Sequence, residues 1–127
     1  MIPRYVLDSG ALIAAERGKD HVARFFRLAH LGRARLVVPF PVIAEWWRGR
    51  SDHRDVILGA TSVVASLDAA KAAGIALARM RDVDARMTID AIVMATAALL
   101  GGIVITGDVS DFEGLGLHFP GVTVLST

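Results

Sequence analysis

The chain has 127 residues, of which 54% are hydrophobic and 21% charged, no cysteine, and a formal net charge of +1 at pH 7. This composition excludes a disordered chain, thiol catalysis, cysteine-ligated zinc and iron–sulfur clusters. The length predicts a single domain over residues 1–127, and the balanced charge neither favours nor excludes nucleic acid as a partner.

Five short apolar runs along the chain have the composition of buried strands. They lie at residues 5–7, 35–38, 62–67, 103–105 and 122–125. Between them, apolar residues recur at helical spacing, and most of these segments begin near a residue suited to a helix start. The predicted helices are residues 11–16 after Ser9, 20–29 from Asp20, 41–47 from Pro41, 68–80 from Asp68, and 89–100 after Thr88. The polar residues 48–54 are predicted to form a loop or a frayed helix end.

Strands that alternate with helices predict a parallel sheet with helices on both faces. We therefore expect an α/β fold of three αβα layers around a central, mainly parallel five-stranded sheet. The apolar stretch 89–105 contains Asp90 and two glycines, so it predicts a buried helix and a strand rather than a membrane span. Residues 1–4 lack the layout of a signal peptide, so we expect a cytoplasmic protein without membrane contact.

Four acidic residues are placed to meet at one edge of this sheet. Asp8 directly follows the first strand, and Asp108 follows the fourth strand by two residues. Asp90 lies in the first turn of a predicted helix, and Glu45 lies early in another. In a parallel sheet the functional crevice lies beyond the carboxyl ends of the strands. If the two helix ends face that edge, the four carboxylates converge.

Each acid also has an ordinary structural explanation. Asp8 could cap the first helix, and Asp108 and Asp111 could be turn residues. Glu45 could pair with Arg48 one helical turn later.

Asp90 favours a functional interpretation more strongly than the other acids. It could simply interact with the helix dipole. However, the helix 89–100 is apolar on nearly every side, and Asp90 is its only charged residue. Because a buried acid needs a partner or a metal ion, Asp90 indicates a site.

Four sequence blocks, in this order, resemble the PIN-domain nucleases and, within them, the VapC-type toxins of toxin–antitoxin pairs. The blocks are residues 6–13, 42–45, 88–97 and 105–112. The resemblance implies a single PIN-like nuclease domain that binds RNA and a small antitoxin and forms a homodimer.

The resemblance also implies roles for individual residues. Asp8, Glu45, Asp90 and Asp108 match the acidic quartet of the family, which carries out catalysis. The supporting residues are Asp111, a frequent fifth acid, Thr106, a small hydroxyl residue beside the site, and Ser9 after the first aspartate. Two positions depart from the family pattern: Gly10 replaces a common serine, and Gly107 replaces a common basic or polar residue.

The clustered carboxylates predict a divalent metal site. Neighbouring carboxylates repel one another, and a hard cation such as Mg²⁺ or Mn²⁺ removes this conflict while preferring oxygen ligands. Asp8, Asp90 and Asp108 are the predicted metal ligands, and Glu45 completes the site directly or through water. Metal-activated water would then cleave RNA to leave a 5′-phosphate and a 3′-hydroxyl.

These observations predict a Mg²⁺-dependent endoribonuclease, the toxin of a VapBC-type pair that blocks translation or growth. One alternative is a PIN-like scaffold without catalysis that binds RNA or a partner. Another is a phosphatase-like or receiver-like α/β domain, although such domains require acids or a lysine at positions where this chain has none.

RNA contacts are harder to place on the sequence. Arg48, Arg50 and Arg54 follow the Glu45 helix and could bind phosphates, although a solvated loop explains them equally well. The four histidines lie in separate segments, so we place none of them in the site.

Overall fold

All five strands join one sheet and run parallel to one another in the computed structural model, which describes residues 1–127. The strand order is β3-β2-β1-β4-β5. The strands are β1 (Arg4–Leu7), β2 (Arg35–Pro39), β3 (Ser62–Val64), β4 (Ile103–Thr106) and β5 (Thr123–Ser126).

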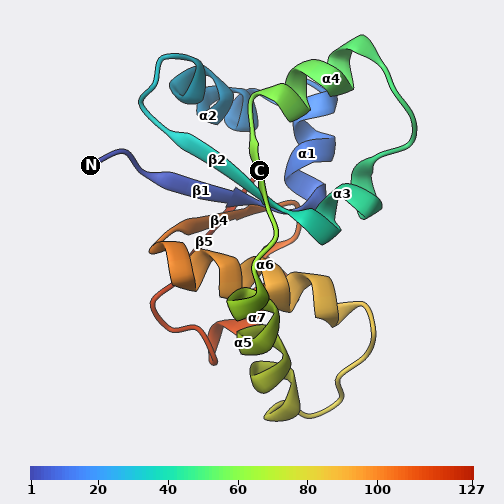
Figure 1. Cartoon of the computed structure of the whole chain (residues 1–127), viewed down its shortest axis with the longest axis vertical. Helices are drawn as coiled ribbons and strands as arrows, with labels where there is room; N and C mark the ends of the chain where they lie inside the picture. Colours follow the sequence, from blue (N-terminus) through green and yellow to red (C-terminus); the bar gives the residue numbers. More distant parts are fainter.

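Helices cover both faces of the sheet, which confirms the three-layer αβα prediction. Figure 1 shows α1, α2 and α4 on one side of the strands and α5, α6 and α7 on the other. The helices are α1 (Ser9–Glu16), α2 (Asp20–His30), α3 (Phe40–Trp46), α4 (Asp52–Gly59), α5 (Leu67–Ala78), α6 (Met87–Leu100) and α7 (Glu113–Gly116), with a short 3₁₀ helix η1 (Val109–Phe112). None of them combines the length and apolar character that crossing a bilayer requires.

The strand order creates a crevice between β1 and β4. From β1 the chain moves outward through β2 to β3, and it then returns to place β4 on the other side of β1. Ligands of such sheets bind where the strand order reverses, beyond the carboxyl ends of the strands. Leu7 is in register with Ile105, and the Asp8 N–H donates to the Ile105 carbonyl at 3.2 Å. The residues that follow β1 and β4 therefore lie together at this point.

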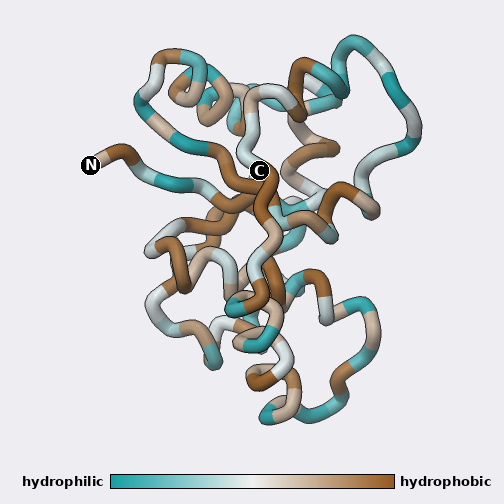
Figure 2. Tube along the Cα trace, in the orientation of Figure 1, coloured by the Kyte–Doolittle hydropathy of each residue, from teal (hydrophilic) through white to brown (hydrophobic).

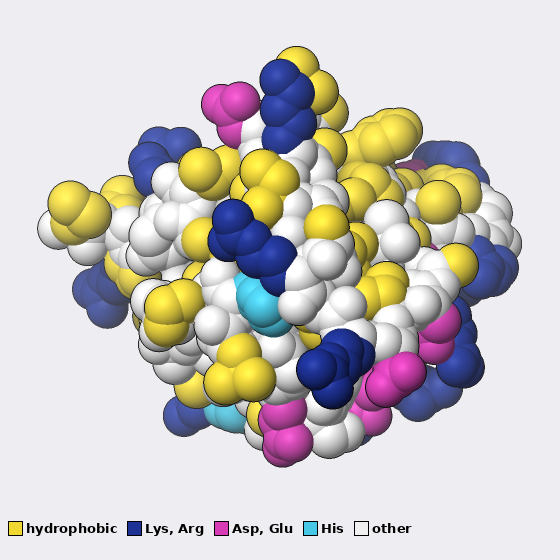
Figure 3. Space-filling model, turned by 90° about the horizontal axis from the view of Figure 1, so that it is seen from below, with side chains coloured by type: hydrophobic (Ala, Val, Ile, Leu, Met, Phe, Trp, Pro, Cys, Tyr) yellow, Lys and Arg dark blue, Asp and Glu magenta, His cyan; other side chains and the backbone are white.

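The central strands form the middle of the hydrophobic core. Val6, Leu7, Val104 and Ile105 are all fully buried, and the brown segments in Figure 2 mark the apolar centre of the sheet. This burial on both faces explains why the strands read as continuous apolar runs. On the face seen in Figure 3, basic and acidic side chains lie side by side along the right-hand edge, so charges of both signs are interspersed there.

Several predicted helix starts were wrong by one or two residues. The side chain of Asp8, not that of Ser9, caps α1, and the side chain of Ser66, not that of Asp68, caps α5. Thr88 lies inside α6, which begins at Met87. The predicted start of α2 at Asp20 is correct, although its N-cap position, Lys19, makes no side-chain capping bond. At α1 and α5 the error arose because a neighbouring residue was equally able to cap the helix.

Three segments differ more from the prediction. Residues 52–54, expected in a loop, begin α4, whose N-cap Ser51 accepts from the Arg54 N–H at 3.1 Å. The third strand covers only Ser62–Val64, because α5 starts at Leu67. The short helices η1 and α7 were not predicted, since a single helical turn gives no periodic signal.

Two glycines bring the start of α1 against the loop after β4. A Cβ atom on Gly10 would lie 2.8 Å from the Gly107 backbone nitrogen, and one on Gly107 would lie 3.1 Å from the Gly10 Cα. The two departures from the family pattern therefore touch each other. This close backbone approach holds Asp8 and Asp108 on adjoining segments.

We expect Gly10→Ala to destabilise the fold by about 1–3 kcal/mol, because the added methyl group overlaps backbone that cannot rotate away. Gly74→Ala in α5 is the matched control, since its Cβ would meet nothing within 4 Å. The control should be neutral or stabilise by up to about 1 kcal/mol through helix propensity. Urea unfolding measures both variants, and equal midpoints would contradict the close approach.

Candidate active site

Five acidic residues line one cavity of about 430 Å³ at the carboxyl edge of the sheet. The structure brings together the four acids predicted from sequence and the three supporting residues in this cavity. They are Asp8, Ser9, Glu45, Asp90, Thr106, Asp108 and Asp111. They come from the ends of β1 and β4, from α1, α3 and α6, and from η1.

Asp8 is buried and held by hydrogen bonds on both oxygens. Its Oδ1 accepts from the Ala11 N–H at 2.8 Å, and its Oδ2 accepts from the Thr106 hydroxyl. Its side chain therefore caps α1 and also lines the cavity. Burial raises the pKa of the Asp8 carboxyl, and the hydrogen bonds from Thr106 and Ala11 oppose this shift.

Thr106 links Asp8 to Asp108. Its hydroxyl donates to Asp8 and accepts from the Asp108 N–H at 3.0 Å. Asp108 Oδ1 in turn accepts from the Ser110 N–H at 3.0 Å and from the Ser110 hydroxyl. The turn predicted at Asp108 is therefore present, and the side chain lines the cavity from within that turn.

The pKa of Asp90 shows the electrostatic effect of the acidic cluster. Burial and the negative charges of the four other acids, Asp8, Glu45, Asp111 and Asp108, together raise the pKa of the Asp90 carboxyl to about 7. Like charges close to one another disfavour ionisation in this way. The metal-free cavity therefore holds a proton on Asp90 through much of the acidic pH range.

The carboxylate oxygens of the cavity suit a hard divalent cation, but only a few of them can contact one ion directly. No three Asp, Glu or His side chains stand close enough together to hold one ion in a shared cage. Zinc sites of the closed, four-ligand kind are therefore not formed here. Mg²⁺ keeps several of its waters and uses one or two protein carboxylates, which fits acids that share a cavity without touching.

Three basic side chains line the same cavity and were not predicted. They belong to Arg17, Lys19 and Arg86. Helical spacing in the sequence could have indicated that two of them lie near the cavity. Arg17 is one helical turn beyond Ile13, and Arg86 lies four residues before Asp90. Arg86 forms an exposed ion pair with Asp84 at 3.3 Å.

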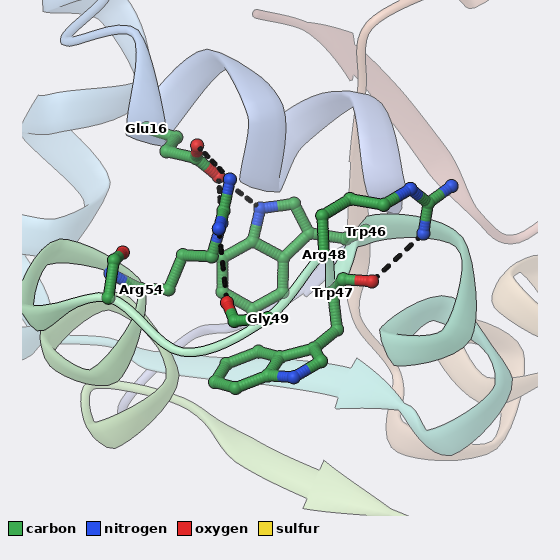
Figure 4. Close-up of polar contacts among 7 residues, drawn as sticks. Glu16, Trp46, Trp47, Arg48, Gly49 and Arg54 are labelled. Carbon is green, nitrogen blue, oxygen red and sulfur yellow. Dashed lines mark hydrogen bonds and ion pairs between the residues drawn. The ribbon is translucent and has the colours of Figure 1, made fainter.

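The predicted RNA-binding arginines are engaged elsewhere. Arg54 donates to both oxygens of Glu16, from Nε at 3.2 Å and from a terminal nitrogen at 3.1 Å, and also to the Gly49 carbonyl at 3.0 Å. Figure 4 shows this guanidinium between Glu16 and the loop after α3. Arg54 therefore joins α4 to α1, and its guanidinium is occupied by partners within the protein.

Arg48 and Arg50 lie on the exposed loop between α3 and α4. Arg48 donates to the carbonyls of Ala44 and Trp47, so the predicted pair with Glu45 is absent. Arg50 pairs with Asp55 at 2.8 Å and stays 76% exposed. Neither side chain lines the acidic cavity.

Trp46 and Glu16 hold the helix that carries Glu45. Trp46 is 3% exposed, and its indole N–H donates to Glu16 Oε1 at 2.9 Å. The Arg54 hydrogen bond lowers the pKa of Glu16, with the Trp46 bond acting in the same direction. The Trp47 ring packs edge-on against Trp46 at 5.8 Å between centroids. This network, drawn in Figure 4, orients the end of α3 next to the cavity.

Comparison with known proteins gives the same fold. The sequence model of the PIN domain family matches residues 5–115. A comparison with curated protein sequences finds no significant match.

Three similar solved structures are described as VapBC or toxin–antitoxin complexes. Chains of the promoter-DNA-bound VapBC2 complex from Rickettsia felis and the DNA-bound VapBC complex from Salmonella typhimurium superpose with TM-scores of 0.73 and 0.69, at 13% and 18% identity. The alignments cover 98% of this chain and 98% of the first, and 99% of this chain and 98% of the second. A toxin–antitoxin complex from Klebsiella pneumoniae gives 0.68 at 22% identity, with 94% of this chain and 95% of the other covered.

We expect Asp90→Asn to raise the melting temperature of the metal-free protein above pH 7. The folded-state pKa of Asp90 is raised from 3.8 to about 7, so its contribution to stability is lost as pH rises through this range. Asparagine cannot ionise, so the gain should shrink as pH falls from 7 and disappear well below pH 3.8, where Asp90 is protonated in both states. Thermal unfolding in a chelator across this pH range measures the effect, and a gain independent of pH would rule out charge repulsion.

Proposed function

Because this chain belongs to the PIN domain family, a family of nucleases, we propose that it is a metal-dependent endoribonuclease that hydrolyses RNA phosphodiester bonds. One observation carries the proposal. Five carboxylates from separate parts of the chain line one cavity, and burial together with the charges of the other four raises the pKa of the fifth, Asp90. Such a shift in a cleft is typical of functional sites.

Asp8, Glu45, Asp90 and Asp108 are the proposed catalytic residues. Mg²⁺ or Mn²⁺ would be held by Asp8, Asp90 and Asp108, with one or two of these in direct contact and the rest, together with Glu45, acting through water. When bound, the ion supplies an activated water and stabilises charge on the leaving oxygen.

The residues around these acids prepare the cavity for a cation. Thr106 and the Ala11 N–H fix both oxygens of Asp8, so this carboxylate does not need to reorient. The five acids exceed the three cavity-lining bases by two charges when all are ionised. One divalent cation balances this excess and displaces the proton of Asp90, after which a phosphodiester anion can enter without net repulsion.

The cavity favours hydrolysis by water over attack by the RNA 2′-hydroxyl. The second route typically uses a pair of histidines as acid and base, and no histidine lines the cavity. Water would add to phosphorus as the 3′-oxygen leaves with a proton. The products are a 5′-phosphate end and a 3′-hydroxyl end.

We also propose that the chain is the toxin of a VapBC-type pair, forms a homodimer, and blocks translation or growth by cutting RNA. The similarity to solved toxin–antitoxin complexes supports this assignment. A small antitoxin would insert an extended or helical segment near the acids. An apolar cavity of about 310 Å³ between α1, α2 and α4, lined by Phe26, Val56 and Ile57, offers space for apolar side chains of such a segment.

The purified chain should cleave a pool of cellular RNA only when Mg²⁺ or Mn²⁺ is present. Asp8→Asn and Asp90→Asn should each lower the rate by about 10- to 100-fold or more, because each removes a charge from the cation site. Asp68→Asn, an exposed acid of α5, is the matched control and should keep the wild-type rate. Sequencing the new ends identifies the chemistry, and a 2′,3′-cyclic phosphate would refute it.

Expression of the wild-type chain in a bacterium should arrest growth, and Asp90→Asn should abolish the arrest. Co-expression with the cognate small antitoxin should restore growth, since the partner would block access to the cavity. Colony counts measure toxicity. Light scattering of the purified protein measures whether it forms a dimer. Normal growth with the wild-type chain alone would refute the toxin assignment and leave the nuclease assignment intact.

A further inference from the structure

One face of α1 runs from the acidic cluster to two basic side chains. Gly10, Ile13, Ala14 and Arg17 all line the cavity, and their spacing of three or four residues puts them on one helical face. The eight residues of α1 span about 12 Å, with Asp8 at its N-terminal end and Arg17 at its C-terminal end. The cavity therefore has an acidic end and a basic end.

The turn after α1 fixes the backbone of both basic residues. The Arg17 N–H donates to the Ile13 carbonyl at 3.0 Å, and the Lys19 N–H donates to the Ala14 carbonyl at 3.0 Å. Between them, Gly18 adopts a left-handed conformation with φ of 72°, which glycine tolerates without strain. Arg17 and Lys19 are thereby held beside the same cavity.

Neither side chain has a partner within the protein. The ion pairs of the structure involve Arg50, Arg54 and Arg86, and no side-chain hydrogen bond is made by Arg17 or Lys19. Both residues are exposed. These two cations are therefore available to a ligand of the cavity.

Helix stability accounts for only one of the two residues. Arg17 ends α1, where the helix dipole favours a positive charge. Lys19 stands at the N-cap position of α2, where the dipole disfavours a positive charge. Lys19 therefore needs another explanation, and an anion in the cavity provides one.

We propose that Arg17 and Lys19 bind a backbone phosphate of the RNA that flanks the cleaved bond, an inference that rests on the proposed nuclease function. Arginine can bind a phosphate through two parallel hydrogen bonds, and lysine acts as a compact charge. Because α1 separates these residues from Asp8, the phosphate they hold is not the one attacked. The strand lies along α1, and this contact is independent of base sequence.

The test measures binding of a labelled single-stranded oligouridylate to protein that carries Asp90→Asn, so that bound RNA is not cut. The double variant Arg17→Gln/Lys19→Gln is compared with Lys71→Gln/Arg79→Gln, which removes the same residue types from exposed positions in α5 and at its C-cap. Each phosphate contact on a single strand contributes about 0.7 to the slope of log affinity against log salt. Because both side chains bind the same phosphate, the cavity variant should lose about 0.7 from this slope, and the α5 variant should lose none.

A second readout is the cleavage of two substrates by the same two double variants, made this time in protein that keeps Asp90. The cavity variant should lose activity on the oligouridylate and keep wild-type activity on the dinucleotide UpU, which has no flanking phosphate to bind. An unchanged salt slope, equal losses in both doubles, or an equal loss on UpU would overturn the proposal. A wild-type chain that cleaves neither these substrates nor the pool of cellular RNA would refute the nuclease function, while the salt slopes would still decide whether these residues bind RNA.

Discussion

Repulsion among carboxylates at the crevice between β1 and β4 is the constraint around which the cavity is organised. The two strands are adjacent and parallel, so the residues that follow them cannot separate. The protein moderates the repulsion locally: Asp8 receives hydrogen bonds from Thr106 and the Ala11 N–H, and Asp90 retains a proton. The apolar core beneath the cavity, where Leu7 and Ile105 are fully buried, offsets the free-energy cost of the remaining repulsion.

The sequence was sufficient to predict the fold and the acidic residues that line the cavity. Buried strands in a parallel sheet are short and apolar, which identified all five. Once β1 and β4 end at the same edge, Asp8 and Asp108 must lie near each other. Asp90 was predicted because an acid in an otherwise apolar helix requires a compensating environment. These inferences depend on strand order and burial, which local sequence patterns express well.

Side-chain partners were not predictable in the same way. The engagement of Arg54 with Glu16 depends on α4, whose first residues, 52–54, were expected in a loop or a frayed helix end. Without that helix, the three arginines at positions 48, 50 and 54 resembled a phosphate-binding segment as much as a solvated loop. The basic residues that do line the cavity, such as Lys19, lie in a turn whose geometry depends on the glycine between two helices. The arginines that stand out in the sequence therefore did not reveal which basic residues line the cavity.

The contact between Gly10 and Gly107 has a consequence for how this protein can diverge from its relatives. A Cβ atom at Gly10 would overlap main-chain atoms of Gly107, whereas one at Gly107 would lie 3.1 Å from the Gly10 Cα, where a shift of a few tenths of an ångström relieves the contact. We therefore expect evolution to accept a side chain at Gly107 more readily than at Gly10. Because each contact involves the main chain, replacing one glycine does not make room for a side chain at the other.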